Sequence, residues 1–185
     1  MSAPTILCPI ANGTEEMEAV TIIDMLRRAG LEVVVAGDGD MVTCSRGVRI
    51  IPDISIDDIG DEDEYDGIVV AGGGQGVENL SNNTTLSAVM VRHRKNKVPI
   101  GAICAAPVLL HDFGLIQPGD TITSHPSVAD DLRPYAYSLD RVVHHDGIIT
   151  SRGAGTAIEF ALTIIQMFTD EATAMKVATD IVLYE

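Results

Sequence analysis

The stretch that decides the fold is Pro99-Ile100-Gly101-Ala102-Ile103-Cys104-Ala105-Ala106-Pro107-Val108-Leu109-Leu110. Its first part has the short apolar pattern of a buried strand, and the proline that follows Ala106 favours the start of a helix. A strand that runs directly into a helix is the repeating unit of α/β folds. Such a turn is sharp and needs small neighbours, which Ala102 and Ala106 provide on either side of Cys104.

The same alternation continues in both directions along the chain. Expected strands cover residues 5–10, 31–36, 67–71, 99–103, 121–124 and 141–151, the last broken by a turn at Asp146-Gly147. Expected helices cover residues 15–29, 86–94, 107–113, 156–168 and 170–178, and a hairpin joins 41–44 to 48–51 through Ser45-Arg46-Gly47. Strands that alternate with helices predict an α/β fold with a mainly parallel sheet.

The first expected helix follows a turn at Asn12-Gly13-Thr14. Thr14 has a side chain suited to an N-cap, and Gly30 is expected to end the helix. Four apolar residues recur at helical spacing and are expected to form the buried face of this helix: Met17, Val20, Ile23 and Leu26.

Composition limits the class of protein. The chain has 185 residues, of which 46% are apolar and 21% charged, and this suits a single domain over residues 1–185 with a large core. A formal net charge of −15 repels nucleic acids and anionic membranes. The sequence contains no basic leader segment and no apolar run near the roughly 18 residues of a membrane span. We therefore expect a cytoplasmic protein without nucleic-acid or membrane partners.

Three cysteines without a C-x-x-C spacing indicate neither a disulfide framework nor a zinc ribbon. Cys8 lies inside a strand and is predicted to be structural. Cys44, beside the hairpin turn, is predicted to be exposed and oxidisable. The carboxylate-rich run over residues 57–66 is expected to be a hydrated loop, because it lacks the ligand spacing of a calcium-binding EF-hand.

Cys104 is the candidate nucleophile. A sulfur at a helix N-terminus faces unpaired backbone N–H groups, which lower its pKa and favour the thiolate. The alternative is a small buried structural cysteine. The run Gly72-Gly73-Gly74 favours the first interpretation, because its N–H groups can bind an anion at the sheet edge where Cys104 also lies. The same glycines are open to two other interpretations, a tight turn or a nucleotide site, although the Gly-x-Gly-x-x-Gly spacing is missing.

Two further titratable residues are expected at this edge. Glu18 lies in the first turn of its helix, and if it is desolvated beside Cys104 it would keep its proton and donate a hydrogen bond to the thiolate. Alternatively, Glu18 and its acidic neighbours only complement the helix N-terminus. His125 ends a strand and is a candidate proton shuttle. The wide separation of these residues selects no metal geometry, so no metal is predicted. Packing or surface roles are expected for the remaining histidines, His93, His111, His144 and His145.

Motifs spread along the chain form a recognisable set: Gly13-Thr14-Glu15-Glu16-Met17-Glu18, Arg27-Arg28-Ala29-Gly30, Cys44-Ser45-Arg46, Gly72-Gly73, Ala102-Ile103-Cys104-Ala105-Ala106-Pro107, Thr123-Ser124-His125-Pro126 and Thr150-Ser151-Arg152-Gly153-Ala154-Gly155-Thr156. Over essentially the whole chain this set resembles the ThiJ/PfpI superfamily, and within it the DJ-one branch of protein deglycases and glyoxalase III-type enzymes. The resemblance implies a flavodoxin-like three-layer sandwich with helices on both faces. It also implies a homodimer, with Glu15 and Arg46 near the subunit interface.

The resemblance also assigns roles at the site. It implies that Cys104 is an oxidation-prone nucleophile, that Glu18 is the protonated carboxyl beside it, and that His125 is the nearby histidine. The amides of Gly73 and Ala105 match the anion pocket of the branch. Superfamily peptidases carry a histidine directly after the nucleophile, and the alanine found there in this chain argues against proteolysis.

The function implied by the resemblance is that of a cofactor-independent cysteine enzyme acting on reactive dicarbonyls. Its substrates would be methylglyoxal and glyoxal, converted to lactate and glycolate, or the glycated proteins that these compounds form. The alternative is a redox-sensing or chaperone protein in which oxidation of Cys104 to sulfinate controls partner binding.

Overall fold

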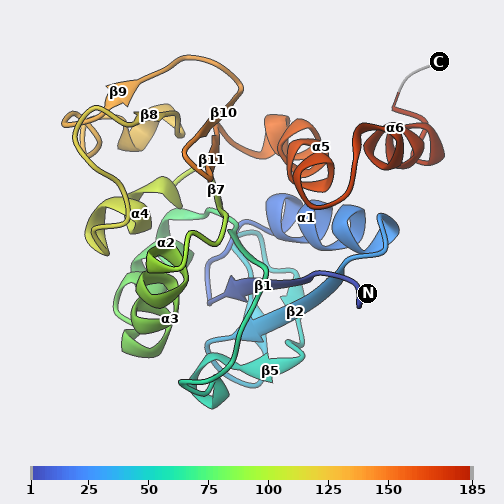
Figure 1. Cartoon of the computed structure of the whole chain (residues 1–185). Helices are drawn as coiled ribbons and strands as arrows, with labels where there is room; N and C mark the ends of the chain where they lie inside the picture. The colour runs from blue at the N-terminus through green and yellow to red at the C-terminus, as the bar shows by residue number, and fades with distance from the viewer. Residues whose placement is uncertain (1, 184–185) are drawn as a thin grey trace.

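The structure is a computed structural model that describes residues 2–183. Its main sheet is formed by β1 (Thr5–Ile10), β2 (Glu32–Gly37), β5 (Ile54–Ser55), β6 (Gly67–Val70), β7 (Ile100–Ile103), β10 (Val142–His145) and β11 (Ile148–Ser151). The seven strands lie in the order β10-β11-β7-β6-β1-β2-β5 (Figure 1). All neighbours are parallel except β10 and β11, which form an antiparallel hairpin. The predicted mainly parallel α/β sheet is confirmed.

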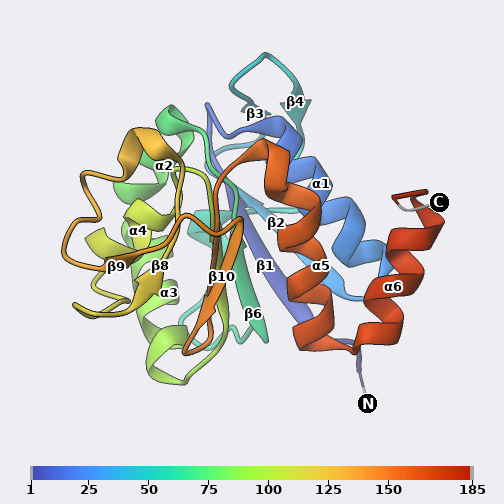
Figure 2. The ribbon, with the colours of Figure 1, turned by 90° about the horizontal axis from the view of Figure 1, so that it is seen from above.

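Helices cover both faces of this sheet. Figure 2 shows α1 (Glu16–Arg28), α5 (Ala157–Phe168) and α6 (Glu171–Asp180) on one side, and α2 (Gly74–Ser81), α3 (Thr84–Lys95) and α4 (Pro107–Asp112) on the other. Successive residues of a strand point to opposite faces, so Ile6 of β1 joins the core under the first group and Leu7 joins the core under the second. The result is the predicted flavodoxin-like three-layer sandwich.

Several short elements lie outside the main sheet. The predicted hairpin is present as β3 (Val42–Thr43) paired with β4 (Arg49–Ile50), and a second small sheet pairs β8 (Thr121–Ile122) with β9 (Ala136–Tyr137). The prediction missed α2, β5 and β9. The sequence of α2 does not indicate a helix, because glycine, which has low helix propensity, occupies two of its first three positions. Strands β5 and β9 are two residues long, too short to show a period.

Helix α1 buries a face that only partly matches the predicted one, because, of the four predicted residues, Leu26 is fully buried and Ile23 partly buried. Met17 and Val20 are 62% and 49% exposed, whereas Ile22, Met25 and Leu26 are buried against the sheet. The 17-20-23-26 spacing is helical, but a second apolar set one position away packs on the core. The outer face of α1 therefore carries apolar side chains that this chain does not cover.

The N-terminus of α1 also differs from the prediction. Its N-cap is Glu15, whose carboxylate accepts a hydrogen bond from the Met17 N–H at 3.2 Å. The Thr14 hydroxyl oxygen instead accepts from the Ala11 N–H at 3.0 Å, and so closes the turn after β1. The C-terminal end is as expected, because Gly30 follows the helix with a φ of 82°, the left-handed conformation that glycine favours.

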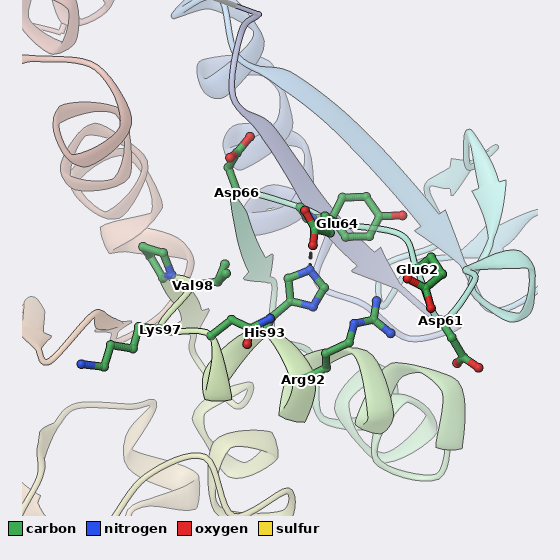
Figure 3. A pocket seen from close by; sticks show the side chains of 11 residues that line it. Asp61, Glu62, Glu64, Asp66, Arg92, His93, Lys97 and Val98 are labelled. Carbon is green, nitrogen blue, oxygen red and sulfur yellow. Dashed lines mark hydrogen bonds between the residues drawn. The ribbon is translucent and has the colours of Figure 1, made fainter.

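The acidic run lies at the amino ends of β6 and β7, where its carboxylates line a cavity of about 720 Å³ together with Tyr65, Arg92 and His93 (Figure 3). The His93 side chain points from α3 toward this loop and is only 3% exposed. Its Nε2 accepts a hydrogen bond from the Tyr65 N–H at 3.1 Å, and its Nδ1 lies 2.8 Å from the Val89 carbonyl oxygen. The ring is therefore neutral, with its proton on Nδ1, and it anchors the acidic loop to α3.

This anchor predicts a pH dependence of stability. Burial lowers the pKa of His93 from its ordinary value of 6.5, so below that pH the unfolded chain binds a proton that the folded chain excludes. The His93 contribution is complete above pH 6.5 and is lost as the pH falls from there through the lowered pKa of the folded state. We expect His93→Leu to remove this component and, at pH 7.5, to cost about 1–3 kcal/mol by leaving the Tyr65 N–H unpaired. Urea unfolding at pH 7.5 and 5.5 measures both effects, with His144→Leu as an exposed control; equal pH dependence in wild type and His93→Leu would contradict the prediction.

Candidate active site

Cys104 lies where β7 ends, in a sharp turn. Its φ is 66°, a left-handed conformation that costs a non-glycine residue roughly 1–2 kcal/mol. Two hydrogen bonds hold the strained backbone: the Cys104 N–H donates to the Ser151 carbonyl at 2.9 Å, and the Cys104 carbonyl accepts from the His125 N–H at 2.8 Å. Backbone strain of this kind is concentrated at functional sites.

The glycines after β6 form the wall beside the sulfur. A Cβ on Gly72 would lie 2.6 Å from the Cβ of Cys104, and one on Gly73, where φ is 94°, would collide with the carbonyl oxygen of Gly13. Neither position has room for a side chain. This close approach places the N–H groups of Gly73 and Ala105 near the sulfur, where both lower the pKa of the thiol. Two backbone donors therefore lie where a negative charge on the sulfur would be stabilised.

Glu18 reaches the same point from α1 and is fully buried. Its Oε2 accepts a hydrogen bond from the Gly72 N–H at 2.7 Å. Its Oε1 has no hydrogen-bond partner among residues 2–183, and the nearby thiol of Cys104 contributes to the pKa of the carboxyl. Burial raises the pKa of Glu18 to about 7, an effect that the hydrogen bonds from Gly72 and Cys104 reduce and the charge of Glu15 reinforces. The structure therefore places the carboxyl of Glu18, desolvated, beside the sulfur.

The expected low pKa of Cys104 does not follow from the structure. Burial first, then the charge and hydrogen bond of Glu18, raise its pKa to about 12, while the Gly73 and Ala105 amides lower it. The amide effect has the sign expected from the sequence, but the expectation included neither the burial nor an ionised neighbour. The two groups form a coupled pair that shares one proton above about pH 7. The sulfur is a thiolate when that proton resides on Glu18, which then donates to it instead of repelling it.

His125 completes the cluster. It follows β8, and its Nδ1 accepts a hydrogen bond from the Ser127 N–H at 3.2 Å and lies 2.7 Å from the Ser127 Oγ. A Cβ on Gly153 would lie 3.6 Å from the His125 Cδ2 and 4.0 Å from both the Cys104 Sγ and the Glu18 Oε1. The structure therefore brings the three predicted site residues together around Gly153, which has no side chain to separate them.

A cavity of about 350 Å³ opens over this cluster. Besides the cluster it is lined by Glu15, Ser45, Arg46, Gly73, Gly74, Ala105, Ser127, Val128 and Ala154. The hairpin turn that carries Arg46 is held at the N-terminus of α1, because the Ser45 Oγ lies 2.8 Å from a carboxylate oxygen of Glu15 and 2.7 Å from one of Glu16, which share its single proton. Ser45, Glu16 and Ser127 were not predicted as site residues, because sequence spacing gives no indication that they meet here.

The other two cysteines are structural. Cys8 is 3% exposed, as expected, and its burial raises its pKa to about 12. The prediction that Cys44 is exposed is wrong: it is 4% exposed, and burial, then the charges of Glu16 and Glu15, raise its pKa. The hairpin folds back on α1 and covers it.

The described residues were also considered for a metal site and for a membrane-spanning helix. Within residues 2–183, no group of three or more His, Cys, Asp and Glu side chains is arranged to hold a metal ion. No helix in the same range is long and apolar enough to span a membrane.

A three-layer α/β sandwich with a cysteine at a strand-to-helix elbow, beside a buried carboxyl, defines a class of cysteine-elbow proteins. Within that class the chain belongs to the DJ-1/PfpI family, which it matches over residues 4–167.

Similar proteins agree with this assignment. The chain is 39% identical over 188 residues to the Parkinson disease protein 7 homolog of Danio rerio, with 99% of each chain covered. It is 37% identical over 155 residues to the glutathione-independent glyoxalase DJR-1.2 of Caenorhabditis elegans, covering 82% of this chain and 81% of that one. The oxidized DJ-1 structure of Toxoplasma gondii superposes with a TM-score of 0.92 at 38% identity, covering 98% of this chain and 99% of that one. These similarities support a function of the DJ-1 type.

Proposed function

We propose that this protein is a cofactor-independent glyoxalase that converts methylglyoxal to lactate and glyoxal to glycolate. The observation that carries the proposal is the meeting of Cys104, Glu18 and His125 around Gly153, beneath a cavity large enough for a small dicarbonyl. The name of the Caenorhabditis elegans relative, a glutathione-independent glyoxalase, supports the same chemistry.

In the first proposed step, the Cys104 sulfur attacks the aldehyde carbon of methylglyoxal. A C–S bond forms, the carbonyl π electrons move to oxygen, and Glu18 gives its proton to that oxygen, which yields a hemithioacetal. The amides of Gly73 and Ala105 lie beside the sulfur and stabilise the negative charge that develops during the attack. His125 contacts the substrate from the cavity wall.

In the second proposed step, ionised Glu18 removes the hydrogen of the attacked carbon as a proton. The electron pair forms an enediol with the neighbouring carbonyl, and Glu18 returns a proton to that second carbon. Glu18 also carries the proton that the first oxygen loses to the second oxygen, which leaves a lactate thioester on Cys104. Water hydrolyses the thioester, so that methylglyoxal and water together give lactic acid and the enzyme is restored.

Protein deglycation extends the same proposal. Early adducts of dicarbonyls with protein thiols or amines form reversibly and present the same aldehyde-derived carbon to Cys104. Both activities require the same reaction at Cys104. The test is therefore the formation of lactate from methylglyoxal without glutathione, followed by NMR, and its dependence on Cys104.

Redox sensing is the second candidate function. The amides of Gly73 and Ala105 and the carboxyl of Glu18 are placed to bind an oxidised sulfur as well as a thiolate. Peroxide would oxidise the thiolate first to a sulfenate and water, and a second peroxide would yield the sulfinate. The Toxoplasma gondii relative has been solved in an oxidized form, which supports this candidate. Peroxide-dependent partner binding without methylglyoxal turnover would favour it over the glyoxalase.

The protein is also proposed to form a homodimer. The uncovered face of α1 lies next to the hairpin, and exposed apolar side chains of both occur there: Met17 and Val20 on α1, and Met41, Val48 and Ile51 on and around the hairpin. A shallow groove between the two elements is lined by Val20, Ile23, Val35, Ile50 and Ile51 together with the charged residues Asp24, Arg27 and Asp53. Exposed apolar side chains gathered in one region form the kind of surface that is typical of subunit interfaces. It begins beside Glu15 and Arg46, so the candidate site would lie near the interface.

Replacing Ile51 by aspartate tests the dimer. Ile51 is 78% exposed in the single chain, so the fold tolerates the change, whereas in a two-fold dimer it buries charges in an apolar interface. We expect the dimer dissociation constant to rise by on the order of 100-fold, since such contacts cost several kcal/mol. Analytical ultracentrifugation measures the constant. Leu139→Asp, at an equally exposed position outside this surface, is the matched control. A wild-type protein that is monomeric at micromolar concentration would refute the dimer.

A further inference from the structure

We propose that His125 acts as a neutral hydrogen-bond donor through Nε2 rather than as a proton shuttle, and that Ser127 is the positioning residue that sets this role. The inference rests on the proposed function, because the group that receives the hydrogen bond is the carbonyl oxygen of the dicarbonyl. It assigns a role to Ser127 and replaces the shuttle role expected for His125.

The protonation state follows from the hydrogen bonds at Nδ1. The backbone N–H of Ser127 points at this nitrogen from 3.2 Å, and a backbone N–H can only donate. Nδ1 must therefore present its lone pair, which places the proton of the neutral ring on Nε2. The Ser127 hydroxyl, 2.7 Å from the same nitrogen, can rotate and thus donates as well. If Nδ1 carried the proton, the Nδ1–H group and the Ser127 backbone N–H would point at each other, and neither could accept a hydrogen bond.

The turn that presents these donors is fixed by the backbone. Pro126 restricts His125 to an extended conformation, in which its φ is −62° and its ψ is 138°. The Val128 N–H donates to the His125 carbonyl at 3.1 Å and closes the turn. His125 is itself tied to the elbow, because its N–H donates to the Cys104 carbonyl at 2.8 Å. The position of Ser127 relative to the ring is therefore set without help from substrate.

The opposite edge of the ring faces the reacting atoms. Cδ2, the ring neighbour of Nε2, is the His125 atom nearest to the point around which the Cys104 Sγ and the Glu18 Oε1 converge. An Nε2–H group at this edge can donate to a carbonyl oxygen of the bound dicarbonyl and polarise it. A neutral imidazole is too weak an acid to give this proton away, so it acts as an electrophile, as neutral histidines do in other enediol-forming enzymes. The transferred protons are then carried by Glu18 alone.

The first test reads the tautomer in the protein without substrate. Two-bond ¹H–¹⁵N correlation spectra at pH 8 are expected to show His125 with its proton on Nε2 in wild type and in Ser127→Thr, which keeps the hydroxyl. Ser127→Ala keeps only the longer backbone hydrogen bond and is expected to show a mixture of tautomers. A wild-type ring that carries its proton on Nδ1 would overturn the inference, and so would an unchanged spectrum in Ser127→Ala.

The second test reads the role during turnover of methylglyoxal. The side-chain amide of His125→Gln can take the place of Nε2–H but can neither accept nor release a proton at neutral pH. We expect His125→Gln to retain at least tenfold more kcat than His125→Leu, and Ser127→Ala to lower kcat by about tenfold with little change in KM, as expected for the weakening of one donor among several. Rescue of kcat by Ser127→Thr completes the prediction.

Equal loss in His125→Gln and His125→Leu would overturn the donor role, and a changed KM at constant kcat in Ser127→Ala would overturn its positioning role. Absence of turnover in the wild type is a failure of the proposed glyoxalase, and the inference fails with it. The spectra taken without substrate would still decide the tautomer.

Discussion

Cys104→Ser is expected to abolish the formation of lactate from methylglyoxal, lowering kcat/KM by roughly 10³-fold or more, as the loss of a catalytic nucleophile does. Serine differs from cysteine by a single atom and fits the strained elbow, but a hydroxyl beside Glu18 forms no appreciable alkoxide near neutral pH. The loss therefore measures the chemistry of the sulfur and not its packing. Proton NMR follows methylglyoxal and lactate directly, without added glutathione.

The same reaction in D₂O distinguishes proton transfer through an enediol from a direct hydride shift. An enediol formed by proton transfer gives lactate that carries deuterium at its second carbon whenever the proton held by Glu18 exchanges with solvent. A direct hydride shift would leave that position protonated. Cys44→Ala is the matched control, because Cys44 is equally a free cysteine but lies outside the cavity that covers the cluster. Lactate formation that survives in Cys104→Ser would contradict both the nucleophile and the mechanism built on it.

The elbow was predictable because the local sequence already favours it, although Ser151 and His125 add hydrogen bonds that hold its backbone. A short apolar strand, small residues around the cysteine and a proline after it leave few conformations, and the φ of 66° at Cys104 agrees with them. The buried face of α1 was not predictable, because its two apolar sets differ by one position and only the packing partners decide between them. One set meets the sheet, and the other, with Met17 and Val20, forms the proposed interface.

The electrostatics of the site illustrate a second limit. A helix N-terminus is a local feature, and the thiolate expected at Cys104 from the sequence rested first on that feature, with support from the glycine run 72–74 and from a protonated Glu18. Glu18 comes from a helix 86 positions earlier in the chain, and burial of the sulfur first, then the charge of Glu18, raise the pKa of Cys104 while the two amides lower it. The Ser127 hydrogen bonds to His125 could not be predicted from the sequence either, and nor could the role of Gly153. Both depend on which segments the folded chain brings together.

Helix α1 joins the candidate site to the proposed dimer interface. Glu18 points inward to Cys104, while Met17 and Val20 on the same two turns point outward to that interface. Glu15 and Glu16, at the start of this helix, hold the Ser45 hydroxyl and with it the hairpin that lines both the cavity and the groove. A change in the interface is therefore expected to reach the site through a single helix rather than through the sheet.

Glu18→Gln is expected to leave Cys104 more reactive than Glu18→Leu does and to slow the proposed turnover of methylglyoxal. The amide removes the ionised neighbour that raises the pKa of the thiol, yet still donates a hydrogen bond to a thiolate, so alkylation of Cys104 by iodoacetamide at pH 8 should be faster than in Glu18→Leu. The amide carries no transferable proton, so kcat for methylglyoxal should fall by roughly 10²–10⁴-fold in both variants. Faster alkylation combined with slower turnover separates the two duties assigned to this carboxyl.

The rate of Cys104 alkylation is expected to rise with pH. Below about pH 7 the wild-type pair holds two protons and the thiolate is scarce; as the pH rises through the raised pKa of Glu18, the pair loses one proton and alkylation accelerates to a plateau. Both Glu18 variants lack this step, because a single thiol remains to titrate. Glu15→Gln, a carboxyl-to-amide change in the same cavity, should keep the step and move it to lower pH, since the charge of Glu15 contributes to the raised pKa of Glu18. A step near pH 7 that persists in Glu18→Gln would assign it to another group and remove Glu18 from the proton transfers.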